Sequence, residues 1–161
     1  MMKCRIFIVL LLTAVLLTVS ACSKPIRTDA PMSSFSFTHS GMHTGLIYTL
    51  SAARTETGWH AELSLLAREK EYVLEMTEAE AEELAAIVRR HELNRWNGFD
   101  RVDRTAKDGT SFDLNIRYED GQALSASGSN AFPKGYREAH EDIIGFFGAL
   151  MEQNGLENPF S

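Results

Sequence analysis

Apolar and polar positions alternate in four segments between residues 35 and 76. The clearest is residues 59–65, where Trp59, Ala61, Leu63 and Leu65 alternate with polar side chains. Period-two alternation predicts strands with one buried and one wet face. The short links between the segments are typical of antiparallel neighbours, so we expect a four-stranded meander.

The next segment, from residue 77 onward, has a helical period. Thr77 and Glu80 have the spacing of a capping box. Acidic residues fill the first turn, and Arg89 and Arg90 lie in the last, which complements the helix dipole at both ends. An apolar stripe is formed by Ala81, Leu84, Ala85 and Val88.

The second half of the chain repeats strands followed by a helix. Residues 94–110 are polar and are expected to form a long loop, anchored by Trp96 and Phe99. Alternation at 112–118 and 124–126 on either side of Asp120-Gly121 predicts a hairpin with a two-residue turn, and residues 136–150 predict a second helix. The expected fold is α+β: an antiparallel sheet in the order ββββα-ββα, with two helices on one face.

The N-terminus has the organisation of a secretory signal peptide. Lys3 and Arg5 are followed by residues 6–19, which carry no charge. This apolar run is about 14 residues, whereas a membrane-spanning helix needs about 20. Small residues at the end of the run are typical of a peptidase cleavage site.

The run Val19-Ser20-Ala21-Cys22 resembles the lipobox of bacterial lipoproteins. The resemblance implies cleavage before Cys22 and fatty acylation of this residue, palmitate being a typical chain. Residues 1–21 are then the signal peptide, 22–34 a lipidated tether and 35–155 a single domain. The protein would face outward from the cell membrane. Ser23 follows Cys22 at the position where lipoproteins retained in the inner membrane of Gram-negative bacteria carry Asp. By resemblance to this sorting rule, the protein would lie on the periplasmic side of the outer membrane if the host is Gram-negative.

Charge narrows the range of partners. Cleavage before Cys22 would remove two of the 16 basic side chains and none of the 22 acidic ones. An acidic domain argues against nucleic acid, which is bound through neutralisation of phosphates. Membrane association is therefore expected through the lipid on Cys22. Cys4 would be lost with the signal peptide, leaving no free thiol, and no cofactor is expected.

Two groups of residues are candidate metal ligands. His39 and His43 have i, i+4 spacing, but the glycines between and after them indicate a solvated turn, and no third ligand is evident. Asp100, Asp103 and Asp108 lack the alternation of a calcium loop. The sequence therefore predicts no metal site.

Serine, histidine and paired carboxylates are the candidate catalytic groups. Ser125 lacks the nucleophile-elbow motif, and nothing in the sequence ties His140 to it. The paired carboxylates of the 77–90 segment are expected to be a solvated helix face; they are Glu78, Glu80, Glu82 and Glu83. No catalytic residue is predicted.

Residues 121–133 are the most distinctive stretch. With the preceding Tyr118-Glu119-Asp120, they resemble a segment of bacterial lipoproteins whose activity is not characterised. Gly128 and Asn130 are able to adopt positive φ, which favours a hairpin and a helix-entry loop. The alternative is a binding lip formed with Trp96.

These observations favour a membrane-anchored lipoprotein with a small extracytoplasmic binding or structural domain and an envelope protein as possible partner. The alternative is a cell-envelope hydrolase whose site is assembled from residues distant in sequence. A deep pocket with convergent polar groups near Trp96 or Asn130 would favour the enzyme.

Overall fold

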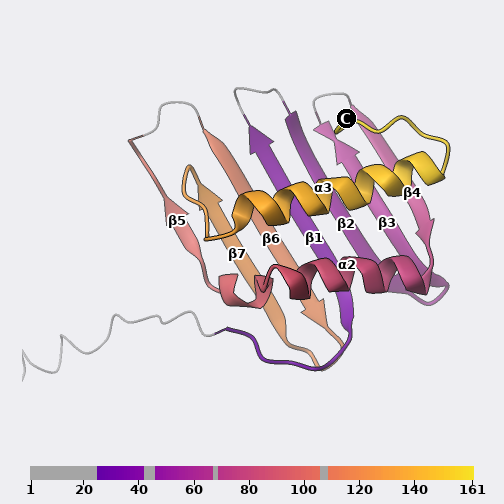
Figure 1. Ribbon diagram of the computed structural model, residues 1–161, viewed down its shortest axis with the longest axis horizontal. Coiled ribbons are helices and arrows are strands. Elements are labelled where there is room, and N and C mark those ends of the chain that lie inside the picture. Colours follow the sequence, from indigo (N-terminus) through magenta and orange to yellow (C-terminus); the bar gives the residue numbers. More distant parts are fainter. Residues whose placement is uncertain (1–24, 42–45, 67–68, 106–108) are drawn as a thin grey trace, which may run out of the picture.

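The computed structural model describes residues 25–41, 46–66, 69–105 and 109–161. Their fold is α+β, as predicted. A seven-stranded sheet has the order β4-β3-β2-β1-β6-β7-β5, and helices α2 and α3 both lie on one of its faces (Figure 1). The strands are β1 (Met32–Gly41), β2 (Leu46–Thr55), β3 (Gly58–Leu65), β4 (Lys70–Met76), β5 (Asp100–Val102), β6 (Thr110–Tyr118) and β7 (Ala123–Ser129).

The predicted meander is confirmed. β1, β2, β3 and β4 pair consecutively and antiparallel, and the side chains that alternate toward the helices are buried. The second unit joins the first through an antiparallel β1–β6 pair. Sequence alternation has no information on that non-local pairing.

Helix α2 (Glu78–Arg90) begins at the predicted capping box. The backbone N–H of Glu80 donates to Thr77 Oγ1, and the backbone N–H of Thr77 donates to the Glu80 carboxylate. Helix α3 (Tyr136–Gln153) covers the middle of the sheet, where Phe147 stacks on Phe35. Both helices therefore form where the apolar period indicated.

The long loop expected at 94–110 is partly ordered as secondary structure. A 3₁₀ helix, η2 (Leu93–Trp96), is followed by β5, which pairs parallel to β7. Glu92 precedes η2 with a φ of 49° and redirects the chain toward the sheet edge. A three-residue parallel strand on a sheet edge has no periodicity that the sequence could reveal.

The N-terminal boundary also differs from the expected tether. Strand β1 begins at Met32, and Ile26 is buried, so residues 26–34 belong to the folded domain. A register shift between Met32 and Ser34 breaks the alternation there, which hid the start of the strand. At the other end, Leu156 and Phe160 pack on the core beyond the expected limit at residue 155.

The β6–β7 turn is longer than the expected two residues. Tyr118 and Gln122 close it through a backbone hydrogen bond of 3.0 Å, and Gly121 has a φ of 84°. The Asp120-Gly121 signal was therefore right about the turn and wrong about its length. Within the described residues, no helix is long and apolar enough to cross a membrane.

Candidate binding groove

A groove of about 630 Å³ lies between the N-terminal segment and helix α2. Figure 1 shows this segment in indigo, running beside α2 before it enters β1. Met32, Trp59, Ala85 and Val88 line its apolar part. Volumes of 300–1,000 Å³ with an apolar lining and a few polar groups are typical of ligand sites.

The N-terminal segment is fixed to the domain at both ends. The backbone N–H of Ile26 donates to the Asn94 carbonyl (3.2 Å), and the Asn94 side chain returns a bond to the Ile26 carbonyl (3.0 Å). At the other end, the backbone N–H of Glu119 donates to the Pro31 carbonyl (3.0 Å). The segment is therefore a wall of the groove as well as the lead into β1.

Between these ends, the segment contacts the β6–β7 turn. Thr28 Oγ1 donates to Asp120 Oδ2 at 2.6 Å, and this bond, with others from Gln122, lowers the pKa of the Asp120 carboxyl. Gln122 also donates to the carbonyl of Arg27 (3.2 Å). These contacts are exposed, so each stabilises the segment only modestly.

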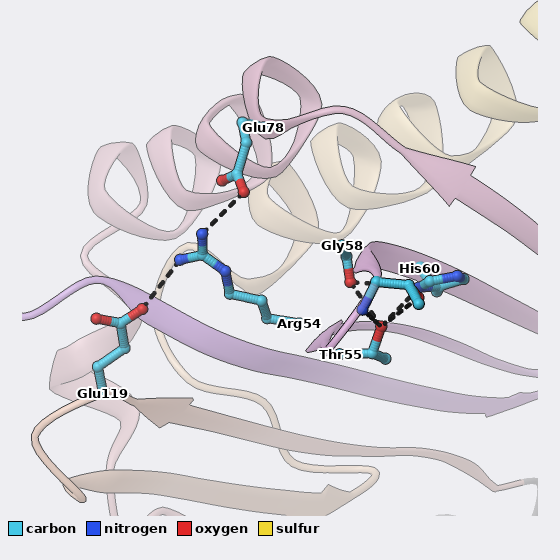
Figure 2. Close-up of polar contacts among 7 residues, drawn as sticks. Arg54, Thr55, Gly58, His60, Glu78 and Glu119 are labelled. Carbon is cyan, nitrogen blue, oxygen red and sulfur yellow. Dashed lines mark hydrogen bonds and ion pairs between the residues drawn. The ribbon is translucent and has the colours of Figure 1, made fainter.

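Charged side chains lie at both ends of the groove. Figure 2 shows the Arg54 guanidinium between Glu78, at the start of α2, and Glu119, at the β6–β7 turn; the N–O distances are 2.9 and 3.2 Å. Arg89 pairs with Glu82 at 2.5 Å farther along α2. All five side chains are substantially exposed, so they define polarity at the rim and contribute little to stability.

The lining combines apolar side chains with charged ones. Among the described lining residues, no serine, cysteine or histidine is present to form a nucleophile–base pair. Burial raises the pKa of the Tyr118 hydroxyl, which therefore stays neutral at physiological pH. Apolar floor and paired rim charges suit a ligand that is partly apolar and partly polar.

The structure corrects the interpretation of His39 as a solvated turn residue. His39 lies in β1, half-buried, with Nδ1 3.1 Å from the Tyr136 hydroxyl and its ring 4.7 Å from that of His140. Tyr48 hydrogen-bonds to His140 in turn. We call these four residues the His–Tyr cluster. Within the described residues, no group of three or more His, Cys, Asp or Glu could hold a metal ion.

Burial lowers the pKa of both histidines in the His–Tyr cluster. For His140 the pKa falls from 6.5 to about 4, with a smaller contribution from repulsion by His39. Burial also raises the pKa of the Tyr48 and Tyr136 hydroxyls. At neutral pH both imidazoles are therefore uncharged, and each shares a hydrogen bond with a tyrosine hydroxyl.

The suggested lip at Trp96 is not present as a surface. Trp96 is buried and packs against Phe112 and Tyr136. Asn130 has the expected positive φ, 53°, and its Oδ1 accepts from the backbone N–H of Thr110 (2.9 Å). Both residues therefore have structural roles, and the groove lies elsewhere.

The other candidate residues lie on different elements of the fold. Ser125 lies on the sheet face away from the helices, whereas His140 lies on α3. Asp103 accepts from both the backbone and the hydroxyl of Thr105, and Asp100 accepts from Ser127. The α2 carboxylates are exposed or in rim ion pairs, apart from the capping Glu80. Cys22, His43 and Asp108 lie outside the described residues.

The groove was missed because its parts are distant in sequence. Ile26, Arg54 and Trp59 come from the N-terminal segment, β2 and β3, and α2 closes the other side. Ile26 in an otherwise polar segment was the one available signal.

A scan against protein-family models and a search of curated proteins found no match for this chain.

Proposed function

We propose that this protein is a lipid-anchored, non-enzymatic binding protein of the cell envelope, in which the groove receives a segment of a partner protein. The lipobox-like run at Val19–Cys22 supports the anchor. The observation that carries the proposal is the position of Ile26. It is fixed beside the groove only four residues after Cys22.

The short connection restricts where the groove would be relative to the membrane. Four residue steps span at most about 14 Å even when fully extended. A lipid on Cys22 would therefore hold the Ile26–Asn94 end of the domain close to the headgroups. The groove would then be presented to partners at the membrane surface.

A polypeptide segment fits the groove better than a fully apolar ligand does. The floor offers contacts to an apolar side chain through Trp59 and Met32. The rim at both ends offers charged groups already held by partners, Arg54 with Glu78 and Arg89 with Glu82. Charged groups at the two ends would orient the polar backbone of a bound segment, and they would contribute to specificity more than to affinity.

The anchor is tested by Cys22→Ser in the full-length chain. We expect the variant to be folded and to move from the membrane fraction to the soluble fraction, because two or more acyl chains are needed for stable anchoring and the variant has none. Fractionation with immunodetection measures the change. Retention in the membrane fraction of a Cys22→Ser variant from which residues 1–21 have been removed would place the anchor elsewhere.

The groove is tested by site-specific photocrosslinking in cells. A photoreactive residue at Glu82, which lines the groove, should give a discrete product with one protein. The same residue at the neighbouring Glu83, which is exposed outside the groove, should not. Ala85→Met, which places a larger side chain in the groove, should reduce the Glu82 product. Equal products from both positions, or none, would contradict the proposed site.

A further inference from the structure

The sheet face opposite the helices carries mainly short polar side chains from β2 to β5, whereas longer side chains such as Glu62 and Glu71 lie on β3 and β4. No helix of the described chain covers this face, which is the far side of the sheet in Figure 1. The pairing register aligns one polar residue from each strand in a single row across the sheet. The row is Glu71, Ser64, Thr49, Thr38, Asp113, Ser127 and Asp100.

A neighbouring row repeats the pattern on β2, β1, β6 and β7, and continues on β3 and β4 with Glu62 and Val73. Ser51, Ser36, Asn115 and Ser125 are cross-strand partners on the same face. Strand propensity does not account for this composition, because wet strand positions usually favour threonine and the larger β-branched and aromatic residues, and Asp and Asn are depleted there. Short side chains instead leave a flat surface that a ligand can approach closely. We call these two rows the hydroxyl face.

The hydroxyl face is hollowed near the β5 edge. A depression of about 270 Å³ is lined by Thr38 of β1, Asp113 of β6, Ser127 of β7 and Asp100 and Arg101 of β5, among others. Ser127 donates to Asp100 Oδ1 at 3.1 Å, and Thr38 and Thr49 are joined through their hydroxyls at 3.0 Å. Side chains of four strands therefore converge here.

We propose that the hydroxyl face binds a neutral, extended β-1,4-linked glycan that lies across the strands, with the depression as its main subsite. Hydrogen bonds are the main contacts that such a surface offers, and a polyhydroxylated polymer is the ligand class that uses them. Neighbouring strands are about 4.8 Å apart, close to the length of one sugar residue in an extended β-linked chain. Each strand then meets one sugar.

Charge and shape select among glycans. Asp100 and Asp113 outnumber Arg101 in the depression, so an anionic polysaccharide is disfavoured. Sugar hydroxyls can donate hydrogen bonds to the two carboxylates. Val102, 60% exposed at the rim, offers an apolar contact to a ring face or to an acetamido methyl group. The inference uses a different surface from the groove and does not depend on the anchor.

The test is calorimetric titration of the purified full-length protein in detergent with two tetrasaccharides. These are β-1,4-linked N-acetylglucosamine tetramer and its unacetylated glucose counterpart, cellotetraose. Saturable binding of either supports the proposal, and preference for the first assigns a role to the acetamido group. Absence of saturable binding of both at millimolar concentration would overturn it, as would binding abolished by a metal chelator.

Two variants with the same charge change locate the site. Asp113→Lys should weaken binding at least tenfold, because it fills the depression and removes an acceptor. Glu75→Lys, on the same sheet face but on strand β4 at the opposite edge, should change affinity less than twofold. Circular dichroism checks that both fold. Equal loss in the two variants would overturn the assignment. Thr38→Ala, a smaller change within the depression, should give an intermediate loss of affinity. This variant replaces Asp113→Lys as the test if Asp113→Lys does not fold.

Discussion

Gly128 illustrates how a residue's role depends on packing that the sequence does not display. It was a candidate for a positive φ, but its φ is not positive in the structure. A Cβ at Gly128 would instead lie 2.1 Å from the Ala131 carbonyl oxygen and 2.7 Å from the Phe112 ring. The chain after β7 folds back against this position, which only a glycine allows.

Gly128→Ala should therefore destabilise the protein by about 1–3 kcal/mol, the range of over-packing in a well-packed region. Gly145→Ala is the matched control. Gly145 is exposed in α3 with nothing within 4 Å of a Cβ, so alanine there should stabilise by up to about 1 kcal/mol. Urea unfolding measures both. A neutral Gly128→Ala would show that the turn after β7 relaxes freely.

At the scale of elements, local sequence predicted the parts whose signals are local. The meander, the capped α2 and the span of α3 follow from alternation, from Thr77 and Glu80, and from the apolar period of 136–150. The β1–β6 pair, strand β5 and the packing of Ile26 depend on contacts between distant residues. The groove and the hydroxyl face were missed for the same reason.

The His–Tyr cluster makes the packing of α3 on the sheet sensitive to pH. The pKa of His140 is about 4 in the folded protein and 6.5 in the unfolded chain. As pH falls below 6.5, the unfolded chain binds a proton that the folded protein does not. The stabilisation is thus complete above pH 6.5 and is lost as pH falls toward 4.

The expected loss between pH 7 and pH 5 is about 1 kcal/mol for His140, once partial exposure of the ring is allowed for. The double variant Tyr48→Phe/His140→Phe removes both partners of the hydrogen bond and should be nearly neutral at pH 7. Its free energy of unfolding should fall less than that of the wild type over this range. Identical pH dependence in the two proteins would show that the cluster does not titrate as described.

At the scale of the whole molecule, the N-terminal segment connects the proposed anchor to the proposed groove. Residues 26–31 are hydrogen-bonded to η2 and to the β6–β7 turn, so they are a wall of the groove and not a free tether. A lipid on Cys22 would orient this end of the domain toward the bilayer. The proposed position of the groove at the membrane surface therefore depends on the claim that Cys22 carries a lipid.

Intact-mass spectrometry of the protein extracted from membranes tests that claim most directly. We expect a chain that begins at Cys22, with a mass increased by a diacylglyceryl group and, in hosts that add it, a further acyl chain. A chain that begins at any other residue, or an unmodified Cys22, would contradict it.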